Sequence, residues 1–203
     1  MKDAVRNTIK ALKENGFEVQ YFKNSSDLKT TLMEQIPLSS SVGIGGAKTI
    51  HELGLHRDLT KRGQPVFWHW LGDQSQRTST LQLASQTNIY LSSANGITED
   101  GKIINIDGVG NRTSSICYGH EKIYFIVGTN KISKNASDSI HRIKTEACPQ
   151  NAERLDLQTP CRYLKKCTDC SSPDRMCNIT LILEKCPMKA DISVFIVPEK
   201  LGF

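Results

Sequence analysis

Four of the seven cysteines of this chain lie close together, at the spacing Cys-x5-Cys-x2-Cys-x6-Cys; they are Cys161, Cys167, Cys170 and Cys177. The two-residue gap between Cys167 and Cys170 is typical of two thiolates on one metal ion, and the outer pair completes four ligands. Four thiolates suit zinc and a [4Fe–4S] cluster equally well. The alternatives are one or two disulfides, or free thiols. A reducing cytoplasm favours a metal or cluster over disulfides.

A glycine turn is the second feature that could bind a ligand. The segment VGIGGAKTIHELG (42–54) predicts a short buried strand, a glycine turn and a helix from about residue 48. Glycines let a ligand approach backbone amides, and a helix N-terminus attracts anions. We therefore expect a phosphate or carboxylate to bind at Gly43, Gly45, Gly46, Lys48 and Thr49. The alternative is an ordinary strand-to-helix turn with the lysine in solvent. The pattern matches neither G-x-G-x-x-G nor a P-loop, so no nucleotide cofactor is predicted.

The segment SSANGITEDGKIINIDGVGNR (92–112) is unusually dense in side chains that do chemistry. These side chains follow two turns around one short strand, and turns at strand ends line the ligand crevice of an open parallel sheet. Paired carboxylates beside basic groups could act as general acid or base, or bind a polar substrate. We expect a buried arginine here to be paired with a carboxylate. The alternative is an ordinary hairpin with two turns. The candidate residues are Asn95, Glu99, Asp100, Lys102, Asp107, Asn111 and Arg112.

The elements that must position these residues alternate along the chain. Helical periodicity is clear in residues 2–15, and β runs occur at FEVQYF, KIINID, KIYFIVG, NITLILEKC and ISVFIVPE. PVFWHW predicts a strand that buries His69, residues 71–80 have no clear period, and ASDSIHRIKTEACPQNAERL predicts one helix broken near Pro149. Strands alternating with helices predict an α/β fold, a mainly parallel sheet with helices on both faces. We expect a single domain over residues 1–203, with a cysteine-rich loop at 159–178.

Composition excludes several classes of function. The net charge is +5, but basic residues alternate with acidic ones, so no nucleic-acid footprint stands out. No stretch approaches the ~20 apolar residues of a membrane span. The N-terminal MKDAVRNTIKALKENG is charged throughout and predicts an amphipathic helix, which is unlike a signal peptide. We therefore expect a cytoplasmic protein.

Several of these segments together resemble a known family. VGIGGAKTIHELG, SSANGITEDGKIINIDGVGNR, KIYFIVGTNKI, NAERL, the four-cysteine loop and IVPEKLGF are similar to the LUD (lactate-utilization) domain, and the resemblance runs from the first helix to Phe203. It implies a three-layer α/β/α sandwich, the fold of glucosamine-6-phosphate deaminase, ribose-5-phosphate isomerase and the CoA transferases. In those relatives a glycine turn after an early strand binds substrate phosphate.

The resemblance also suggests catalytic residues. GITEDGKIINID is similar to the deaminase's GIGEDGHIAFNE, which places Asp100 on a catalytic aspartate and Asp107 on a catalytic glutamate. Glu99 and Lys102 flank the first of these, and the lysine replaces a histidine, which argues against sugar-phosphate deamination. Two further departures are Ala47, where the family often has serine, and Leu164-Lys165, where Thr-Gly often precedes the second loop cysteine.

The resemblance implies a protein that binds or converts a small anionic metabolite, namely a hydroxy acid, a keto acid or a phosphorylated compound. Some members are linked to bacterial lactate oxidation, where a LUD subunit accompanies iron–sulfur redox proteins. The alternative is a non-catalytic accessory subunit, or a redox sensor, that uses the cysteine loop. The residues alone do not assemble a nucleophile, base and orienting group, so they leave open whether the chain is an enzyme. They also permit a homo-oligomer.

Overall fold

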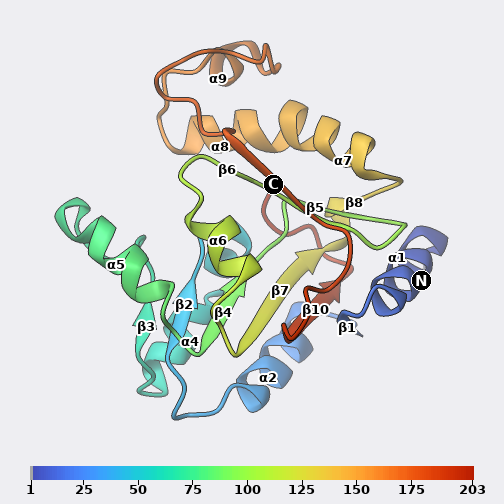
Figure 1. Cartoon of the computed structure of the whole chain (residues 1–203), viewed down its shortest axis with the longest axis vertical. Helices are drawn as coiled ribbons and strands as arrows, with labels where there is room; N and C mark the ends of the chain where they lie inside the picture. Colours follow the sequence, from blue (N-terminus) through green and yellow to red (C-terminus); the bar gives the residue numbers. More distant parts are fainter. Residues whose placement is uncertain (1) are drawn as a thin grey trace.

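The computed structural model describes residues 2–203 and is built on a six-stranded sheet in the order β1-β10-β7-β4-β2-β3. Every neighbouring pair in this sheet is parallel (Figure 1). Apolar side chains fill the central strands because both faces of the sheet are covered. The strands are β1 (Glu18–Tyr21), β2 (Val42–Ile44), β3 (Val66–Phe67), β4 (Ile89–Ser92), β7 (Lys122–Gly128) and β10 (Ile192–Val197).

Helices cover both faces of this sheet. On one face pack α2 (Ser25–Gln35), α3 (Lys48–Leu53) and α4 (Leu55–Lys61). On the other pack α1 (Asp3–Glu14) and α6 (Asn111–Cys117). Strand β7 shows the alternation, because Tyr124 and Ile126 belong to the first core and Phe125 to the second. The predicted three-layer α/β/α fold is confirmed.

A second, four-stranded sheet in the order β8-β5-β6-β9 packs beside α1 and α6. Its middle strands form an antiparallel hairpin, so the turn of the hairpin and the carboxyl end of β6 lie at opposite ends. The other face of β6 contacts a long helical run. The strands are β5 (Gly96–Thr98), β6 (Ile103–Asp107), β8 (Ile132–Ser133) and β9 (Ile179–Leu183).

The long helical run consists of α7 (Ala136–Arg142), the π-helix η3 (Ile143–Ala147) and α8 (Cys148–Arg154). The predicted break near Pro149 is therefore a change of helix type, and the proline lies in the first turn of α8, directly after the π-helix. The short α9 (Pro160–Leu164) and the cysteine loop lie beyond α8, on the side away from the six-stranded sheet (Figure 1).

One local prediction was wrong, and one segment for which no element was predicted contains helix. Residues 71–80 contain a 3-10 turn, η1 (Gln74–Gln76), and the start of α5 (Arg77–Ala84), whose weak periodicity reflects how little of it is buried. Strand β3 ends at Phe67, so His69 lies in a turn and only half buried. Helix α5 packs against β2 and β3.

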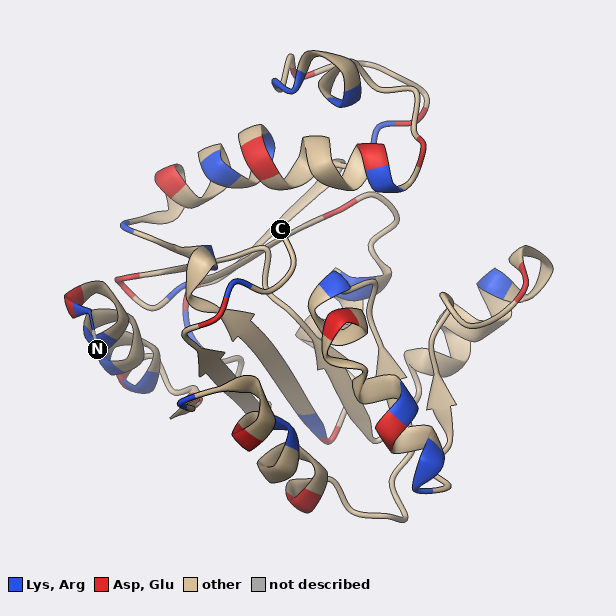
Figure 2. Cartoon of the chain, turned by 180° about the vertical axis from the view of Figure 1, so that it is seen from behind, with Lys and Arg blue, Asp and Glu red and all other residues tan. Residues whose placement is uncertain are grey.

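Charged residues lie mostly on the helices and connecting loops, with Lys/Arg and Asp/Glu interspersed (Figure 2). Within residues 2–203, no helix has the length and apolar character that a bilayer span requires.

Candidate functional site

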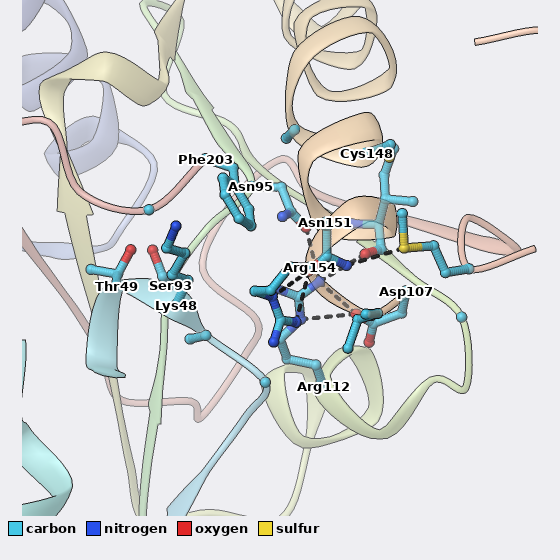
Figure 3. A pocket seen from close by; sticks show the side chains of 18 of the residues that line it. Lys48, Thr49, Ser93, Asn95, Asp107, Arg112, Cys148, Asn151, Arg154 and Phe203 are labelled. Atoms are coloured by element: carbon cyan, nitrogen blue, oxygen red, sulfur yellow. Dashed lines mark hydrogen bonds and ion pairs between the residues drawn. The ribbon is translucent and has the colours of Figure 1, made fainter. Parts of the chain in front are cut away.

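A cavity of about 210 Å³ opens at the carboxyl ends of three adjacent strands, β2, β4 and β7. The glycine turn follows β2, Ser93 follows β4, and Lys131 ends the 3-10 turn η2 (Thr129–Lys131) that follows β7. The loop after β6, helix α8 and the C-terminal residues Gly202 and Phe203 supply the remaining walls (Figure 3). This is the edge of a parallel sheet at which ligands usually bind.

Arg112 is held rigidly in this cavity. Its Nε and Nη2 donate to Oδ1 of Asp107 at 2.8 and 2.6 Å, and Nη2 also donates to Oδ1 of Asn95 at 2.9 Å (Figure 3). The other carboxylate oxygen of Asp107 accepts from the amide of Thr113 at 2.8 Å. Asp107 is thus the carboxylate partner expected for a buried arginine. Within residues 2–203, Nη1 of Arg112 has no hydrogen-bond partner, so it is available to a ligand.

Lys131 is buried at the inner end of the cavity. Its Nζ contacts the hydroxyl oxygens of Ser93 at 2.9 Å and Thr49 at 3.1 Å, and it has no ion pair with a carboxylate in the described part of the chain. Burial lowers the pKa of Lys131 to about 7, and the positive charges of Arg142 and Arg112 add to this effect, whereas Glu52 opposes it. At neutral pH this amine therefore exchanges readily between its charged and neutral forms.

The lining of the cavity is strongly cationic. Five basic side chains line it, against one carboxylate side chain, Asp107, which is paired with Arg112. A second of the five, Lys48, lies 3.7 Å from a carboxylate oxygen of Glu52, which is outside the lining. The basic residues are Lys48, Arg77, Arg112, Lys131 and Arg154.

An aromatic wall closes one side of the cavity. The guanidinium of Arg154 lies 4.4 Å from the ring centroid of Trp70, in a cation–π contact, and donates to Oδ1 of Asn151. The neighbouring His69 also lines the cavity; burial, then the charges of Arg77 and Arg154, lower its pKa to about 4. His69 is therefore neutral at physiological pH.

Most of the predicted ligand-binding residues meet here. The cavity is lined by Gly46, Lys48, Thr49, Asn95, Asp107, Asn111 and Arg112. Two predicted glycines do not line it. At Gly43 a Cβ would lie 2.3 Å from the carbonyl oxygen of Ala84, so this glycine serves the packing of α5 on β2. The amide of Gly45 donates to the carbonyl of Leu91 at 3.1 Å and is not free for an anion.

The acidic turn of the hairpin lies elsewhere. Glu99, Asp100 and Lys102 are absent from the cavity lining. Asn7 and Asn15 of the α1 region donate to Glu99 and to the Asp100 carbonyl, and Lys102 pairs with Asp100 at 3.0 Å. The expectation that Asp100 shares a crevice with the glycine turn is therefore wrong, because the antiparallel hairpin places this turn at the opposite end of β6 from Asp107.

Several cavity residues were not predicted as site residues from the sequence, among them His69, Arg77, Ser93, Lys131, Asn151 and Arg154. One signal for Lys131 was present, since it lies near the end of the segment KIYFIVGTNKI, three positions after the longest β run. Its isolation from carboxylates could not be read from the sequence.

The cysteine loop forms a second, smaller cavity of about 20 Å³. The four predicted thiols, Cys161, Cys167, Cys170 and Cys177, all line it. Between residues 165 and 171 only the two cysteines are not exposed, so their thiols face inward. A fifth cysteine, Cys148 at the start of α8, lines the same cavity and was not predicted.

Local contacts surround these thiols with donors and positive charge. The amide of Asp169 donates to the sulfur of Cys167 at 3.4 Å, and Lys144 and Arg175 line the cavity. Burial, with the neighbouring thiols as a second cause, raises the pKa of Cys148 to about 12. All seven cysteines are free thiols. Within residues 2–203, no three His, Cys, Asp or Glu side chains are already arranged as metal ligands.

Comparison with known proteins gives one family and one fold. The LUD domain family model matches residues 5–197. No curated protein matches the chain. Among solved structures, the chain is similar to a DUF162 family protein from Deinococcus radiodurans, with a TM-score of 0.55, 10% sequence identity and 96% of each chain covered. At that identity the likeness concerns the fold alone.

Proposed function

The chain belongs to the LUD domain family, and on this premise we propose that the cavity at the carboxyl ends of β2, β4 and β7 binds a small organic anion, namely a hydroxy acid, a keto acid or a phosphorylated compound. The family is associated with lactate utilization. A link of this chain to lactate is part of the proposal.

The observation that carries the proposal is the excess of positive charge in the cavity. Five basic side chains face one carboxylate, and that carboxylate is occupied by Arg112. Lys48 pairs with Glu52, but Arg77, Lys131 and Arg154 have no ion pair among the described residues. Cations without a partner in a partly desolvated cleft cost free energy unless an anion joins them. The volume of about 210 Å³ lies below the roughly 300–1,000 Å³ of pockets for drug-sized ligands, which favours a metabolite of a few carbon atoms.

Two groups would recognise the anion directly. Asp107 and Asn95 fix the guanidinium of Arg112 and leave Nη1 to donate to a carboxylate or phosphate oxygen. Lys48 lines the same cavity and lies 4.3 Å from the ring centroid of Phe203, so it can reach the ligand from the C-terminal wall.

Lys131 would supply acid–base chemistry. An amine that titrates near neutral pH can accept a proton from a hydroxyl or donate one to a carbonyl oxygen. Ser93 and Thr49 hold Nζ in place, so the group is oriented before a ligand arrives. Lys131 is thus the best candidate for a catalytic group, if the bound anion is also converted.

Calorimetric titration of the full chain with L-lactate, pyruvate and glycerol 3-phosphate tests the proposal, with lactamide as the uncharged control. We expect at least one anion to bind and lactamide not to bind. Arg154→Gln, on the cavity wall, should weaken binding several-fold, whereas Lys166→Gln, on the exposed loop, should leave it unchanged. Equal binding of lactamide and lactate, or binding that ignores Arg154, would overturn the proposal.

A second candidate function is that of an accessory subunit with a thiolate-bound zinc ion or [4Fe–4S] cluster, which would work beside iron–sulfur redox proteins. Five inward-facing thiols around one small cavity favour it. The two functions are compatible, because the two cavities are distinct.

A further inference from the structure

We propose that the small cavity lined by the five cysteines (the thiol cavity) binds a single thiophilic metal ion such as zinc, and that Cys148 is one of its ligands. We further propose that Cys148 couples binding of this ion to binding of an anion in the cavity at the carboxyl ends of β2, β4 and β7 (the anion cavity, also called the large cavity). The coupling rests on the proposed anion-binding function. The role of Cys148 as a ligand stands independently of that function.

Cys148 lies in the wall between the two cavities. It lines the large cavity and the thiol cavity, and so does Met176. From there a chain of contacts reaches the cations of the large cavity. Nδ2 of Asn151 lies 3.1 Å from the sulfur of Met176, and Oδ1 of the same side chain accepts from Arg154. Cys148, Asn151 and Arg154 thus follow one another along the wall of the anion cavity (Figure 3).

A π-helical turn directly before Cys148 sets the direction of its side chain toward this wall. The π-helix η3 ends at Ala147, directly before it. A π turn holds about one residue more than an α turn, which rotates the following side chains by about 100° around the axis. Segments of this kind are rare in proteins and are frequently found at functional sites. Cys148 is thus presented from a rigid element, whereas three of the other thiols come from a loop.

The surroundings suit a metal held by thiolates. One divalent ion on four thiolates leaves a net charge of about minus two, and the two cations Lys144 and Arg175 line the cavity. The amide of Asp169 donates to Cys167, and the hydroxyl of Thr159 lies 3.3 Å from the sulfur of Cys161. Hydrogen bonds of this type orient metal ligands and tune the site.

The size of the cavity favours one ion over a cluster. About 20 Å³ is close to the roughly 10–15 Å³ of a single water-sized sphere. The thiols surround this space without forming a complete ligand set, so binding would draw the loop inward onto Cys148.

The sign of the coupling follows from charge. Four neutral thiols that bind a divalent ion release protons and become a unit of net negative charge. This charge would lie beside the cationic cavity and weaken anion binding. By linkage, the anion would weaken metal binding by the same factor, for which about five-fold or more is typical of coupled sites.

The test uses the full chain, reduced and stripped of metal by a chelator. Zinc is titrated against a chromophoric chelator, and cobalt is added separately to observe thiolate-to-metal absorption. L-Lactate binding, or that of whichever anion binds the metal-free protein, is then measured with and without zinc. The variants are Cys148→Ser and Cys148→Ala, the second in case the serine is not tolerated in a partly buried position. Cys117→Ser and Cys186→Ser are the controls, because both cysteines lie outside the thiol cavity.

We expect one zinc per chain, thiolate absorption with cobalt, and anion affinity about five-fold or more lower in the zinc form. Both Cys148 variants should abolish or weaken zinc binding and thereby reduce the effect of zinc on anion affinity. The controls should change neither. Zinc binding and coupling that keep their wild-type strength in both Cys148 variants would overturn the proposal.

Four other outcomes also test the proposal. Failure of the wild-type chain to bind zinc would overturn the metal site, and iron with acid-labile sulfide in anaerobically purified protein would overturn the single-ion assignment. If no anion binds the metal-free protein, the proposed function and the coupling fail together. The zinc titrations of wild type and the Cys148 variants then still test whether Cys148 is a ligand. Anion binding that is indifferent to zinc would overturn the coupling alone.

Discussion

Nζ of Lys131 lies 2.9 Å from Oγ of Ser93, although the two residues follow different strands of the central sheet. The contact buries an amine among hydroxyl groups with two arginines nearby. Desolvation and like charge both disfavour the ammonium form, so the protein holds a lysine that titrates in the physiological range.

Anion affinity should therefore depend on pH through Lys131. A bound carboxylate favours the ammonium form, so affinity should be highest below pH 7 and fall above it, by at most about ten-fold per pH unit for one linked proton. Lys131→Met should bind weakly at pH 6 and lose this dependence. Lys134→Met, at an exposed lysine nearby, should behave as wild type in calorimetry from pH 6 to 8.5. His69, with its pKa of about 4, does not titrate in this window.

The titration of Lys131 should affect folding stability in the opposite direction, so that stability rises with pH whereas anion affinity falls. In the unfolded chain lysine titrates near 10.4, whereas Lys131 in the folded state titrates at about 7. Between these values the unfolded state binds more protons, so this group makes wild-type stability rise with pH. Lys131→Met should thus gain most over wild type near pH 7, and the gain should shrink toward pH 10. Urea unfolding at several pH values measures this difference, and a constant difference would contradict it.

The buried pair of Asp107 and Arg112 should be far more important for stability than the exposed pair of Asp100 and Lys102. Side-chain exposure is 6% for Asp107 and 48% for Asp100. Asp107→Ala leaves a buried guanidinium without its partner and should cost about 3–5 kcal/mol in the free energy of unfolding. Asp100→Ala should cost about 1 kcal/mol or less. Denaturant unfolding of both variants, side by side, makes the comparison, and equal losses would refute it.

Two glycines of the turn should respond differently to alanine. A Cβ at Gly43 would lie 2.3 Å from a backbone oxygen, whereas one at Gly46 would lie 3.5 Å from the ring of His69. Gly43→Ala should lower thermal stability markedly, because the backbone of α5 must shift. Gly46→Ala should fold normally and weaken anion binding, since it adds a methyl group to the cavity lining. Melting temperature and calorimetry, read together, distinguish the two effects.

The local elements of this protein could be predicted from its sequence. Alternation and helical periodicity identified most strands and helices, and their order along the chain predicted the parallel sheet. The cysteine spacing predicted inward-facing thiols between Cys161 and Cys177, which line one cavity. Asp107 and Arg112 were both predicted because they belong to a short segment dense in polar side chains, and a carboxylate partner was expected for the arginine. The two residues lie five positions apart at a strand-to-helix turn, which brings them together locally.

Tertiary structure alone decided which of these groups act together. Parallel strands are joined by crossovers, so neighbours at one sheet edge, such as Thr49, Ser93 and Lys131, are distant in sequence. The antiparallel hairpin had the opposite effect, separating Asp100 from Asp107 although a single short strand joins them. Cys148 lines the thiol cavity because α8 packs against α9 and the cysteine loop. Burial and charge around a group depend on such long-range neighbours, and no local pattern encodes them.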